Sequence, residues 1–396
     1  MTKPLPIAIV GGGPAGALAA ELLAAGGSRV LLFDEKLAWE KPCGGGLTHK
    51  ALTQYPFLAE AHSDSKFIRH CELVSPEGRS ARFDLHHPLA IFSRLALNGL
   101  LLNRALRAGA DVHKERVTGI SGGPEEWRLI TPLGAYDASD VVLAAGARNP
   151  FRSQFTSAIS PEDLMVTAGY FIPGNSNLVQ IQFLKNISGY IWVFPRPGHL
   201  SAGIAAKMGE TSTAELRRQL EQWLAANDFD LDGARFYSHI LPAFRPQTLD
   251  EMKLCGDGWS MIGDSAGLVD PITGEGLYYA LRSAELCAQA LLAGKPAQYA
   301  ADMEQEIMPE LKLAARVSQR FYTGQIFGES VLERMISLTA QNENIRDLMS
   351  DLFAGIQGYQ GLRNRLLRIL PGLMLEGLAG NLKFPGKSPE PIKNPS

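Results

Sequence analysis

A glycine-rich turn near the N-terminus constrains the fold of this 396-residue chain more than any other feature. An apolar run leads into Gly11-x-Gly13-x-x-Gly16, an Ala/Leu-rich helical segment follows, and a second apolar run ends at Asp34. Strand, glycine turn, helix, strand and terminal carboxylate in this order predict a βαβ unit that binds a dinucleotide.

Each residue of this fingerprint has a physical role in the prediction. Gly11 permits the tight turn, Gly13 lets a pyrophosphate approach the backbone, and Gly16 lets helix and strand pack closely. The helix N-terminus offers N–H groups and positive potential to the phosphates. Asp34 is expected to accept hydrogen bonds from ribose hydroxyls. A glycine-rich turn without a ligand is the competing interpretation.

A second block favours FAD over NAD as the dinucleotide. An apolar segment ends in Gly263-Asp264, and flavoprotein hydroxylases place such an aspartate on hydroxyl groups of FAD. Gly274 and Gly276 then open a helix whose N-terminus can face the flavin N1–C2=O, where negative charge develops on reduction. The sequence contains no second fingerprint, so electrons are expected from transiently bound NAD(P)H or from a reduced carrier protein. No flavin-attachment signature is evident, which predicts non-covalent FAD.

Composition limits the class of protein. Hydrophobic residues make up 45% and charged residues 20%, which supports a large folded core. The net charge of −3 predicts no nucleic-acid partner. No apolar run reaches the ~18 residues of a membrane span, and the four cysteines are scattered without metal-ligand spacing. These features predict a cytoplasmic protein without a metal site.

The pattern of elements predicts an α/β fold in three parts. A discontinuous Rossmann-like FAD-binding domain is expected over residues 1–160 and 245–300. Strand-length segments broken by Gly, Pro and Asn predict a substrate-binding antiparallel sheet over 161–244, to which the hairpin predicted over 68–85 is a candidate addition. Residues 301–396 are expected to form a helical region. Further strands are expected at 111–120, 127–131 and 140–144.

Three blocks of the sequence resemble one family of flavoproteins. They are Lys-Pro-Cys-Gly-Gly-Gly-Leu at 41–47, Tyr-Ile-Trp-Val-Phe-Pro at 190–195, and a long glycine-containing block at 263–276. Together they resemble the geranylgeranyl reductase family, within the larger class shaped like para-hydroxybenzoate hydroxylase. The resemblance runs from residue 5 to about residue 295. It implies that FAD contacts Ala15, Asp34, Cys43, Gly44, Gly46, Arg94, Val117, Asp264, Gly276 and Leu277.

The sequence departs from its relatives at two places. Hydroxylases carry an Asp-Gly pair after the strand predicted at 140–144, whereas this chain has Ala145-Gly146. The missing carboxylate predicts slow direct reduction by NAD(P)H. The family follows the 190–195 block with Gly-x-Gly, whereas this chain has Gly203-Ile204-Ala205. The second difference concerns the substrate side of the site rather than the fold.

Side chains for catalysis and substrate binding are expected close to the flavin. Tyr190, Trp192 and Phe194 alternate along a predicted strand and therefore share one face. They form the aromatic core of the sheet, a wall of the substrate site, or both. Cys43 is a candidate proton donor, and the alternative role is a small residue that lets the isoalloxazine approach. Tyr190 is the second catalytic candidate.

An amphipathic helix is predicted near the C-terminus. Arg365 and Arg368 lie opposite its apolar face, and Pro371 is expected to kink it. In one interpretation the apolar face packs on the core. In the other it contacts a membrane surface peripherally, which suits a lipid substrate. The apolar face consists of Leu362, Leu366, Ile369, Leu370 and Leu373.

The resemblance also implies a reaction. Enzymes of this family saturate C=C bonds of a geranylgeranyl or other polyprenyl chain, with hydride from flavin N5 and a proton from an acid or an ordered water. Two other functions stay open. One is an FAD-dependent monooxygenase or halogenase acting on an aromatic or alkyl compound. The other is a flavoprotein that transfers electrons to a quinone, which would normally need an iron–sulfur cluster that scattered cysteines supply poorly.

Overall fold

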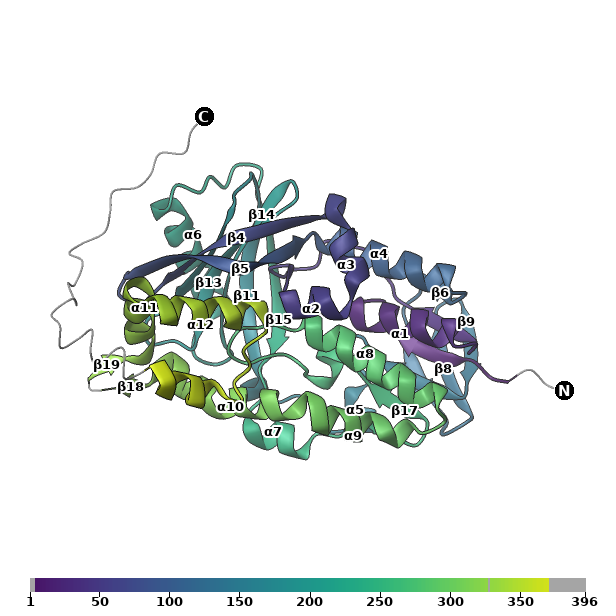
Figure 1. Cartoon of the computed structure of the whole chain (residues 1–396). Coiled ribbons are helices and arrows are strands. Elements are labelled where there is room, and N and C mark those ends of the chain that lie inside the picture. Colours follow the sequence, from purple (N-terminus) through teal and green to yellow (C-terminus); the bar gives the residue numbers. More distant parts are fainter. Residues whose placement is uncertain (1–3, 327, 370–396) are drawn as a thin grey trace.

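The computed structural model describes residues 4–326 and 328–369. Within these residues, a six-stranded and an eight-stranded β-sheet occupy opposite ends of an elongated molecule (Figure 1). The N-terminal glycine turn follows the first strand of the smaller sheet, and the larger sheet contains most strands from the middle of the chain. The fold is α/β, as the sequence predicts.

The six-stranded sheet is parallel except at one edge. β1 pairs in parallel with β2 and β10, parallel pairing continues to β6 and β17, and only β16 is antiparallel to its neighbour. The central strands are apolar and buried because helices pack against them. The order is β16 (Cys255–Gly256), β17 (Trp259–Met261), β10 (Asp140–Leu143), β1 (Ile7–Val10), β2 (Val30–Phe33) and β6 (Asp111–His113).

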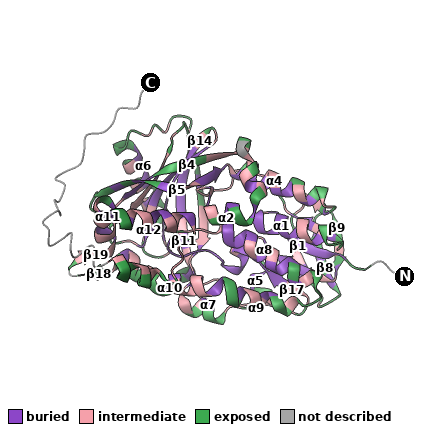
Figure 2. Cartoon of the chain, viewed as in Figure 1, coloured by how far each residue is buried: buried purple, intermediate pink, exposed green. Residues whose placement is uncertain are grey.

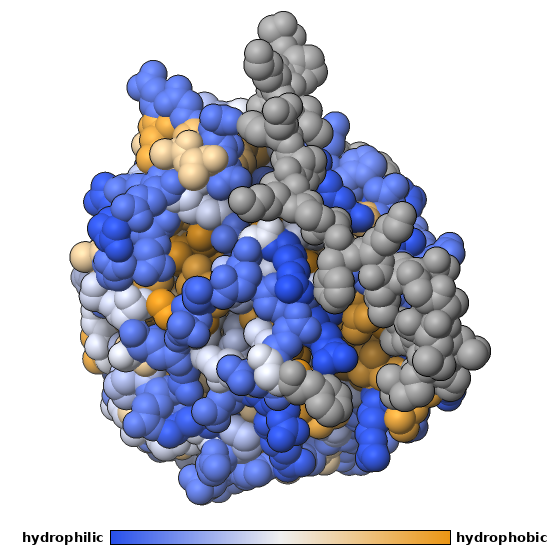
Figure 3. Space-filling model, turned by 90° about the vertical axis from the view of Figure 1, so that its left-hand side faces the viewer, coloured by the Kyte–Doolittle hydropathy of each residue, from blue (hydrophilic) through white to orange (hydrophobic). Residues whose placement is uncertain are grey.

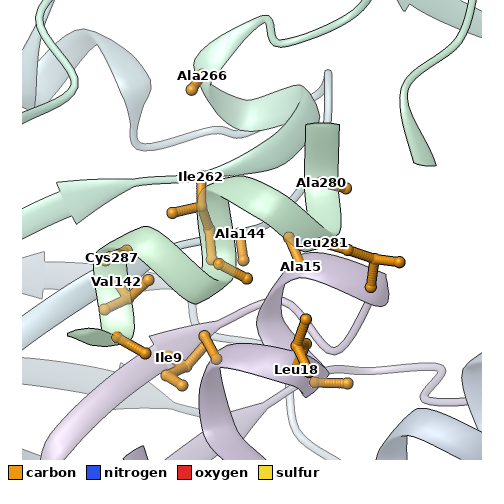
Figure 4. Close-up of a cluster of buried hydrophobic side chains, with 14 of the residues drawn as sticks. Ile9, Ala15, Leu18, Val142, Ala144, Ile262, Ala266, Ala280, Leu281 and Cys287 are labelled. Carbon is orange, nitrogen blue, oxygen red and sulfur yellow. The ribbon is translucent and has the colours of Figure 1, made fainter. Parts of the chain in front are cut away.

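Small residues allow helices to approach this sheet closely. Helix α1 (Pro14–Ala25) packs against β1, β2, α4 (Arg94–Arg107) and α8 (Leu277–Leu292). Ala15, Ala144 and Ala280 gather where α1 and α8 meet the strand ends (Figure 4). A Cβ on Gly16 would lie 1.9 Å from the Gly11 carbonyl oxygen. The third glycine of the fingerprint is therefore needed for packing between helix and turn.

The eight-stranded sheet is antiparallel except for the parallel pair β12 and β4. The hairpin predicted over 68–85 corresponds to β4 and β5 and joins this sheet next to β12. The order is β15 (Arg235–Pro242), β11 (Leu164–Pro173), β14 (His199–Lys207), β13 (Gly189–Arg196), β12 (Leu178–Phe183), β4 (Ser65–Val74), β5 (Ser80–Phe92) and β3 (Gly46–Leu47).

Different helices pack against different parts of the eight-stranded sheet. Helix α6 (Thr213–Ala226) packs on β11 and β14, and its leucines share a core with Ile191 and Val193. Helices α11 (Val331–Gln341) and α12 (Glu343–Ala354) pack on β5. Because side chains alternate along a strand, Tyr190, Trp192 and Phe194 point away from α6.

The remaining elements are short or peripheral. A small antiparallel sheet comprises β7 (Gly119–Ser121), β8 (Trp127–Thr131) and β9 (Gly134–Ala138). The other helices are α2 (His49–Gln54), α3 (Pro56–Glu60), α5 (Arg152–Phe155), α7 (Pro246–Glu251), α9 (Pro296–Glu306) and α10 (Met308–Thr323), and β18 (Gln325–Ile326) pairs with β19 (Glu329–Ser330). Single 3₁₀ turns span His62–Asp64, Pro161–Asp163 and Gly263–Ala266.

Several sequence-based assignments of strands are wrong in detail. The strand expected at 111–120 is two strands in different sheets, β6 and β7. Strands β9 and β15 are not among the predicted ones. The helical region expected from residue 301 also contains the β18–β19 pair. Of the predicted amphipathic helix, Leu370, Pro371 and Leu373 lie outside the described residues.

The distribution of buried residues is the one expected when helices pack against two separate sheets. Buried residues follow the strands and the inner faces of α1 and α8, and exposed residues follow the outer helix faces (Figure 2). Across residues 4–326 and 328–369, no helix combines the length and the apolar character that a bilayer span requires.

Candidate active site

A cavity of about 1110 Å³ extends from the glycine turn to the helices α10–α12. Its far wall is apolar, with side chains from the eight-stranded sheet on one side and from α11 and α12 on the other. Figure 3 looks onto the end of the molecule that carries these helices, where apolar side chains are visible inside hollows bordered by hydrophilic residues. The apolar wall includes Leu73, Leu89, Ile181, Phe183, Met335, Leu338, Met349 and Leu352.

The end of the cavity next to the glycine turn is polar. Gly13 caps the N-terminus of α1, Arg94 begins α4, and both line the cavity together with Lys41 and Asp264. Lys41 Nζ lies 3.2 Å from Asp264 Oδ2. Burial raises the pKa of Asp264, but the charges of Lys41 and Arg94 outweigh burial and lower the pKa overall. Asp264 is therefore a carboxylate at neutral pH.

Buried polar groups without partners, and free space beside a glycine, make this polar end suitable for binding FAD. Arg94 Nε and His239 Nε2 are buried and have no hydrogen-bond partner in the described part of the chain. Burial and the charge of Lys41 lower the pKa of His239 to about 3, so its imidazole is neutral. No atom lies within 4 Å of a Cβ built on Gly13. Free space beside a helix N-terminus, with a buried guanidinium next to it, suits a pyrophosphate.

The loop at residues 41–47 is held against the eight-stranded sheet. Arg196, at the end of β13, is fully buried and donates hydrogen bonds to Glu40 and to the carbonyl oxygens of Cys43 and Gly44. Ser201 Oγ also donates to the Cys43 carbonyl oxygen, at 2.7 Å. Glu40 in turn accepts from the Arg94 backbone N–H at 2.8 Å. One buried arginine thus joins the sheet, the loop and the start of α4.

The aromatic residues of β13 line the cavity, and each meets a glycine. A Cβ on Gly46 would lie 3.0 Å from the Phe194 ring, and a Cβ on Gly203 would lie 2.2 Å from the Trp192 ring. Trp192 pairs with Gly203 in the ladder between β13 and β14. Gly203 matches the first glycine of the family's Gly-x-Gly, and a larger residue at this position would overlap the Trp192 ring. At the second position this chain has Ala205, opposite Tyr190.

The two candidate proton donors differ in their electrostatics. Burial raises the pKa of the Cys43 thiol, but Arg94 and Arg196 outweigh burial and lower it overall, which favours the thiolate. Burial, together with Asp270 and Cys43, raises the pKa of Tyr190 well above its usual value. The Tyr190 hydroxyl donates to the Thr273 carbonyl oxygen at 2.9 Å. The lowered pKa weakens the hold of Cys43 on its proton, whereas the raised pKa strengthens the hold of Tyr190.

The structure brings most of the predicted site residues into one cavity. Those outside its lining are Gly11 and Gly16, which pack on each other, together with Asp34 and Val117. The Asp34 carboxylate accepts from the Gly12 backbone N–H at 2.7 Å, and Val117 is buried in the core. The predicted residues that line the cavity are Gly13, Ala15, Cys43, Gly44, Gly46, Arg94, Tyr190, Trp192, Phe194, Asp264, Gly274, Gly276 and Leu277.

Sequence reasoning missed several polar residues of the site. Lys41 lies in the block at 41–47, but Asp264, to which its ammonium group donates a hydrogen bond, is 223 residues away. Glu40 and Arg196 are 156 residues apart. Glu275 also belongs to the block at 263–276, but residues that shift its pKa, Lys50 and Thr48, come from another part of the chain. Of these residues, only Glu275 is flanked by glycines, so the sequence gives a local signal for that residue alone.

Comparison with curated proteins finds several relatives that are named as reductases. The geranylgeranyl diphosphate reductase of Nicotiana tabacum is 27% identical over 320 residues, which cover 73% of this chain and 66% of that protein. The digeranylgeranylglycerophospholipid reductase of Methanoculleus marisnigri is 27% identical over 305 residues, covering 72% and 75% of the two chains. The chain thus spans just under two thirds of the plant relative's length. No family model matches the sequence.

Comparison with solved structures supports the fold. A geranylgeranyl bacteriochlorophyll reductase-like protein from Thermoplasma acidophilum matches with a TM-score of 0.76 at 20% identity, covering 92% of this chain and 99% of that one. A flavin-dependent brominase matches with a TM-score of 0.68 at 18% identity, covering 89% and 93%. The curated relatives named above are reductases, and the polar end of the cavity has room and charge for FAD. The chain resembles geranylgeranyl reductases in sequence and has the fold of FAD-dependent oxidoreductases.

Proposed function

We propose that this enzyme reduces C=C bonds in a geranylgeranyl or other polyprenyl chain. The observation that carries the proposal is the long apolar wall that continues the polar, cofactor-type end of the same cavity. A polyprenyl chain has no polar group along its length, so only an apolar surface can order it next to the cofactor. The names of the plant and archaeal relatives support the same substrate class.

In this proposal the polar end of the cavity holds FAD. The N-terminus of α1 at Gly13 and the Arg94 guanidinium bind the pyrophosphate, and Asp264 accepts hydrogen bonds from hydroxyl groups of the cofactor. Asp34 lies outside the cavity lining, beyond the glycine turn, where it can receive the ribose. When bound, FAD supplies hydride equivalents from its N5 position. The loop at 41–47, fixed by Arg196, sets how closely the ring and the substrate wall approach.

The rest of the cavity orders the substrate and excludes water. Trp192 and Phe194 present flat apolar faces beside the loop, and the residues of α11 and α12 close the opposite side. Burying apolar surface contributes about 25 cal/mol per Å², so a chain of several isoprene units gains enough binding energy to hold one double bond in place. Exclusion of water also keeps the reduced cofactor from side reactions.

The alternative function is an oxygen-dependent monooxygenase or halogenase. Its support is the structural match to a flavin-dependent brominase, which at 18% identity speaks for the fold alone. The third function, electron transfer to a quinone, is supported only by the name of one further relative, the menaquinone reductase of Mycobacterium tuberculosis, which is 27% identical over 311 residues. We therefore design the experiment to separate the first two.

The decisive experiment is a single anaerobic turnover. We expect dithionite-reduced enzyme to reoxidise when it receives geranylgeranyl diphosphate or a geranylgeranylated lipid, and mass spectrometry to show two added hydrogens per bond. A monooxygenase or halogenase would be silent without oxygen and would add oxygen or halogen when oxygen and halide are present. Lack of anaerobic turnover with every prenyl chain length, combined with oxygen-dependent modification of an aromatic compound, would contradict the proposal.

A matched pair of variants tests the substrate wall in the same assay. Trp192→Ala removes a cavity-lining indole, whereas Trp127→Ala removes a buried indole from β8, which does not line the cavity. We expect the first to lower kcat/KM for prenyl substrates roughly 10- to 200-fold through lost apolar contact. The second is expected to lower stability without changing kcat/KM of the folded enzyme. Equal effects of the two variants would show that Trp192 serves only as core.

We also propose that the mouth of the cavity rests on a membrane surface. Several residues of the cavity lining are exposed and apolar, namely Val317, Ile326, Ile356 and Leu366, and the exposed Arg320 lies among them. An apolar rim with a basic side chain is typical of peripheral lipid contact. Sedimentation with anionic vesicles should retain the wild type and lose a variant with Ile356→Ser and Leu366→Ser. Equal partitioning of both proteins would disprove this contact.

A further inference from the structure

The loop that connects the two ends of the cavity is tightly fixed. A Cβ on Gly274 would lie 2.4 Å from the Tyr190 hydroxyl oxygen, and a Cβ on Gly276 would lie 3.2 Å from Asp264 Oδ1. Glu275 is the residue between these glycines, and its carbonyl oxygen accepts from the Asp270 N–H at 2.9 Å. The backbone of Glu275 is thus placed where the substrate wall, marked by Tyr190, meets the polar end, marked by Asp264.

The side chain of Glu275 has an unused oxygen in this position. Glu275 lines the cavity, and its Oε1 is shielded from solvent without a hydrogen-bond partner among the residues described. A carboxylate oxygen in that setting is costly, because it loses water without gaining a donor. A protonated carboxyl group avoids this cost and keeps a proton on a side chain that lines the cavity.

We propose that Glu275 is the acid that protonates the alkene carbon during reduction, an assignment that rests on the proposed function. The O–H bond of Glu275 breaks as a new C–H bond forms at one alkene carbon, and hydride from reduced FAD completes the C–H bond at the other. The product gains two hydrogens, FAD is left oxidised, and Glu275 is left as a carboxylate. A two-electron reductant, either a nicotinamide or a reduced carrier protein, restores FAD, and a proton from solvent restores Glu275.

The charges around Glu275 favour this role at neutral pH. Burial and the nearby Asp270 raise the pKa of Glu275 to about 7, against the opposing effects of Lys50 and Thr48. Its other titratable neighbours are Tyr278 and Tyr279 on α8, while Glu306 and Glu310 line the same region from α9 and α10. The Tyr359 hydroxyl donates to Asp270 at 2.8 Å. An acid with a pKa near the working pH gives up its proton readily and is still protonated often enough to act.

The test compares Glu275→Gln with the wild type in anaerobic reoxidation by a geranylgeranyl substrate. We expect the wild-type rate to fall as pH rises above 7, because the acid form disappears, and the variant to react about 10²- to 10⁴-fold more slowly without that pH dependence. Reoxidation by ferricyanide needs no proton on carbon, so it should be unchanged. The matched control is Glu306→Gln, which alters another cavity-lining carboxylate, one paired with Arg282, and should keep the wild-type pH profile.

A second readout needs no turnover. Infrared titration of the resting protein should show a protonated-carboxyl C=O band that disappears as pH rises through 7 and that is absent in Glu275→Gln. If wild type turns over and Glu275→Gln matches its rate and pH profile, Glu275 is not the acid, and the proposed function stands. If wild type fails to reduce any prenyl chain, the proposed function fails and this assignment fails with it.

Discussion

Replacing Arg196 by methionine is expected to lower the free energy of unfolding by about 3–5 kcal/mol, the usual cost of removing one partner from a buried ion pair. Arg196 is fully buried and joins Glu40 to the carbonyl oxygens of Cys43 and Gly44. Methionine fills the volume but leaves the Glu40 carboxylate without its cation and two carbonyls with fewer donors. Urea denaturation followed by circular dichroism measures the change.

A second substitution separates charge from packing. Glu40→Gln in the Arg196→Met background removes the unpaired charge, while the amide oxygen can still accept from the Arg94 N–H and the amide N–H can donate to the Ser93 hydroxyl oxygen. We expect the double variant to recover part of the lost stability. A single variant within about 1 kcal/mol of the wild type would show that Glu40 finds water or another cation when Arg196 is absent.

Alanine substitutions at Gly13 and Gly16 are expected to impair different properties, namely FAD binding at Gly13 and folding stability at Gly16. At Gly16 the new Cβ would overlap the Gly11 carbonyl oxygen at 1.9 Å, and no rotamer relieves a clash with backbone. The helix must move, at a cost of about 1–3 kcal/mol or more. At Gly13 the backbone has φ −69° and nothing lies within 4 Å of the new Cβ. Gly13→Ala should fold with a loss within about 1 kcal/mol but bind FAD poorly, because the methyl group occupies the pyrophosphate space.

Two measurements distinguish these outcomes. The melting temperature of the apoprotein should fall for Gly16→Ala and stay close to wild type for Gly13→Ala. FAD titration should show weakened binding for both, and in Gly13→Ala the loss occurs without lost stability. Tight FAD binding by Gly13→Ala would mean that the pyrophosphate does not lie beside the N-terminus of α1.

The sequence predicts the parts of the fold that depend on local patterns. The glycine turn, α1, β2 and the alternating aromatics of β13 carry strong local signals, because turn geometry and side-chain alternation are properties of short segments. β15 is less evident because Arg235–Pro242 mixes charged, polar and aromatic residues and ends in proline. The stretch 111–120 is ambiguous because two strands that belong to different sheets lie only a few residues apart.

The electrostatics of the site could not be predicted in the same way. The pKa values of Cys43 and Glu275 depend on Arg94, Arg196, Asp270 and Lys50, which reach the site from different elements. The place of Cys43 in the glycine-rich loop makes it a candidate proton donor, and that assignment stays a prediction. The guanidinium groups that favour its thiolate form become apparent only once the chain is folded.

The order in which strands enter the two sheets has a consequence for how the protein is made. The parallel sheet uses β1 at Ile7–Val10 and is completed by β16 and β17, which ends at Met261. At about 5–20 residues per second, a ribosome needs roughly 10–50 s to pass from the first of these strands to the last. During that time the nascent chain exposes apolar edges that later residues cover. We expect the two halves to resist separate expression, and a cut anywhere between β3 and β15 to leave both sheets incomplete.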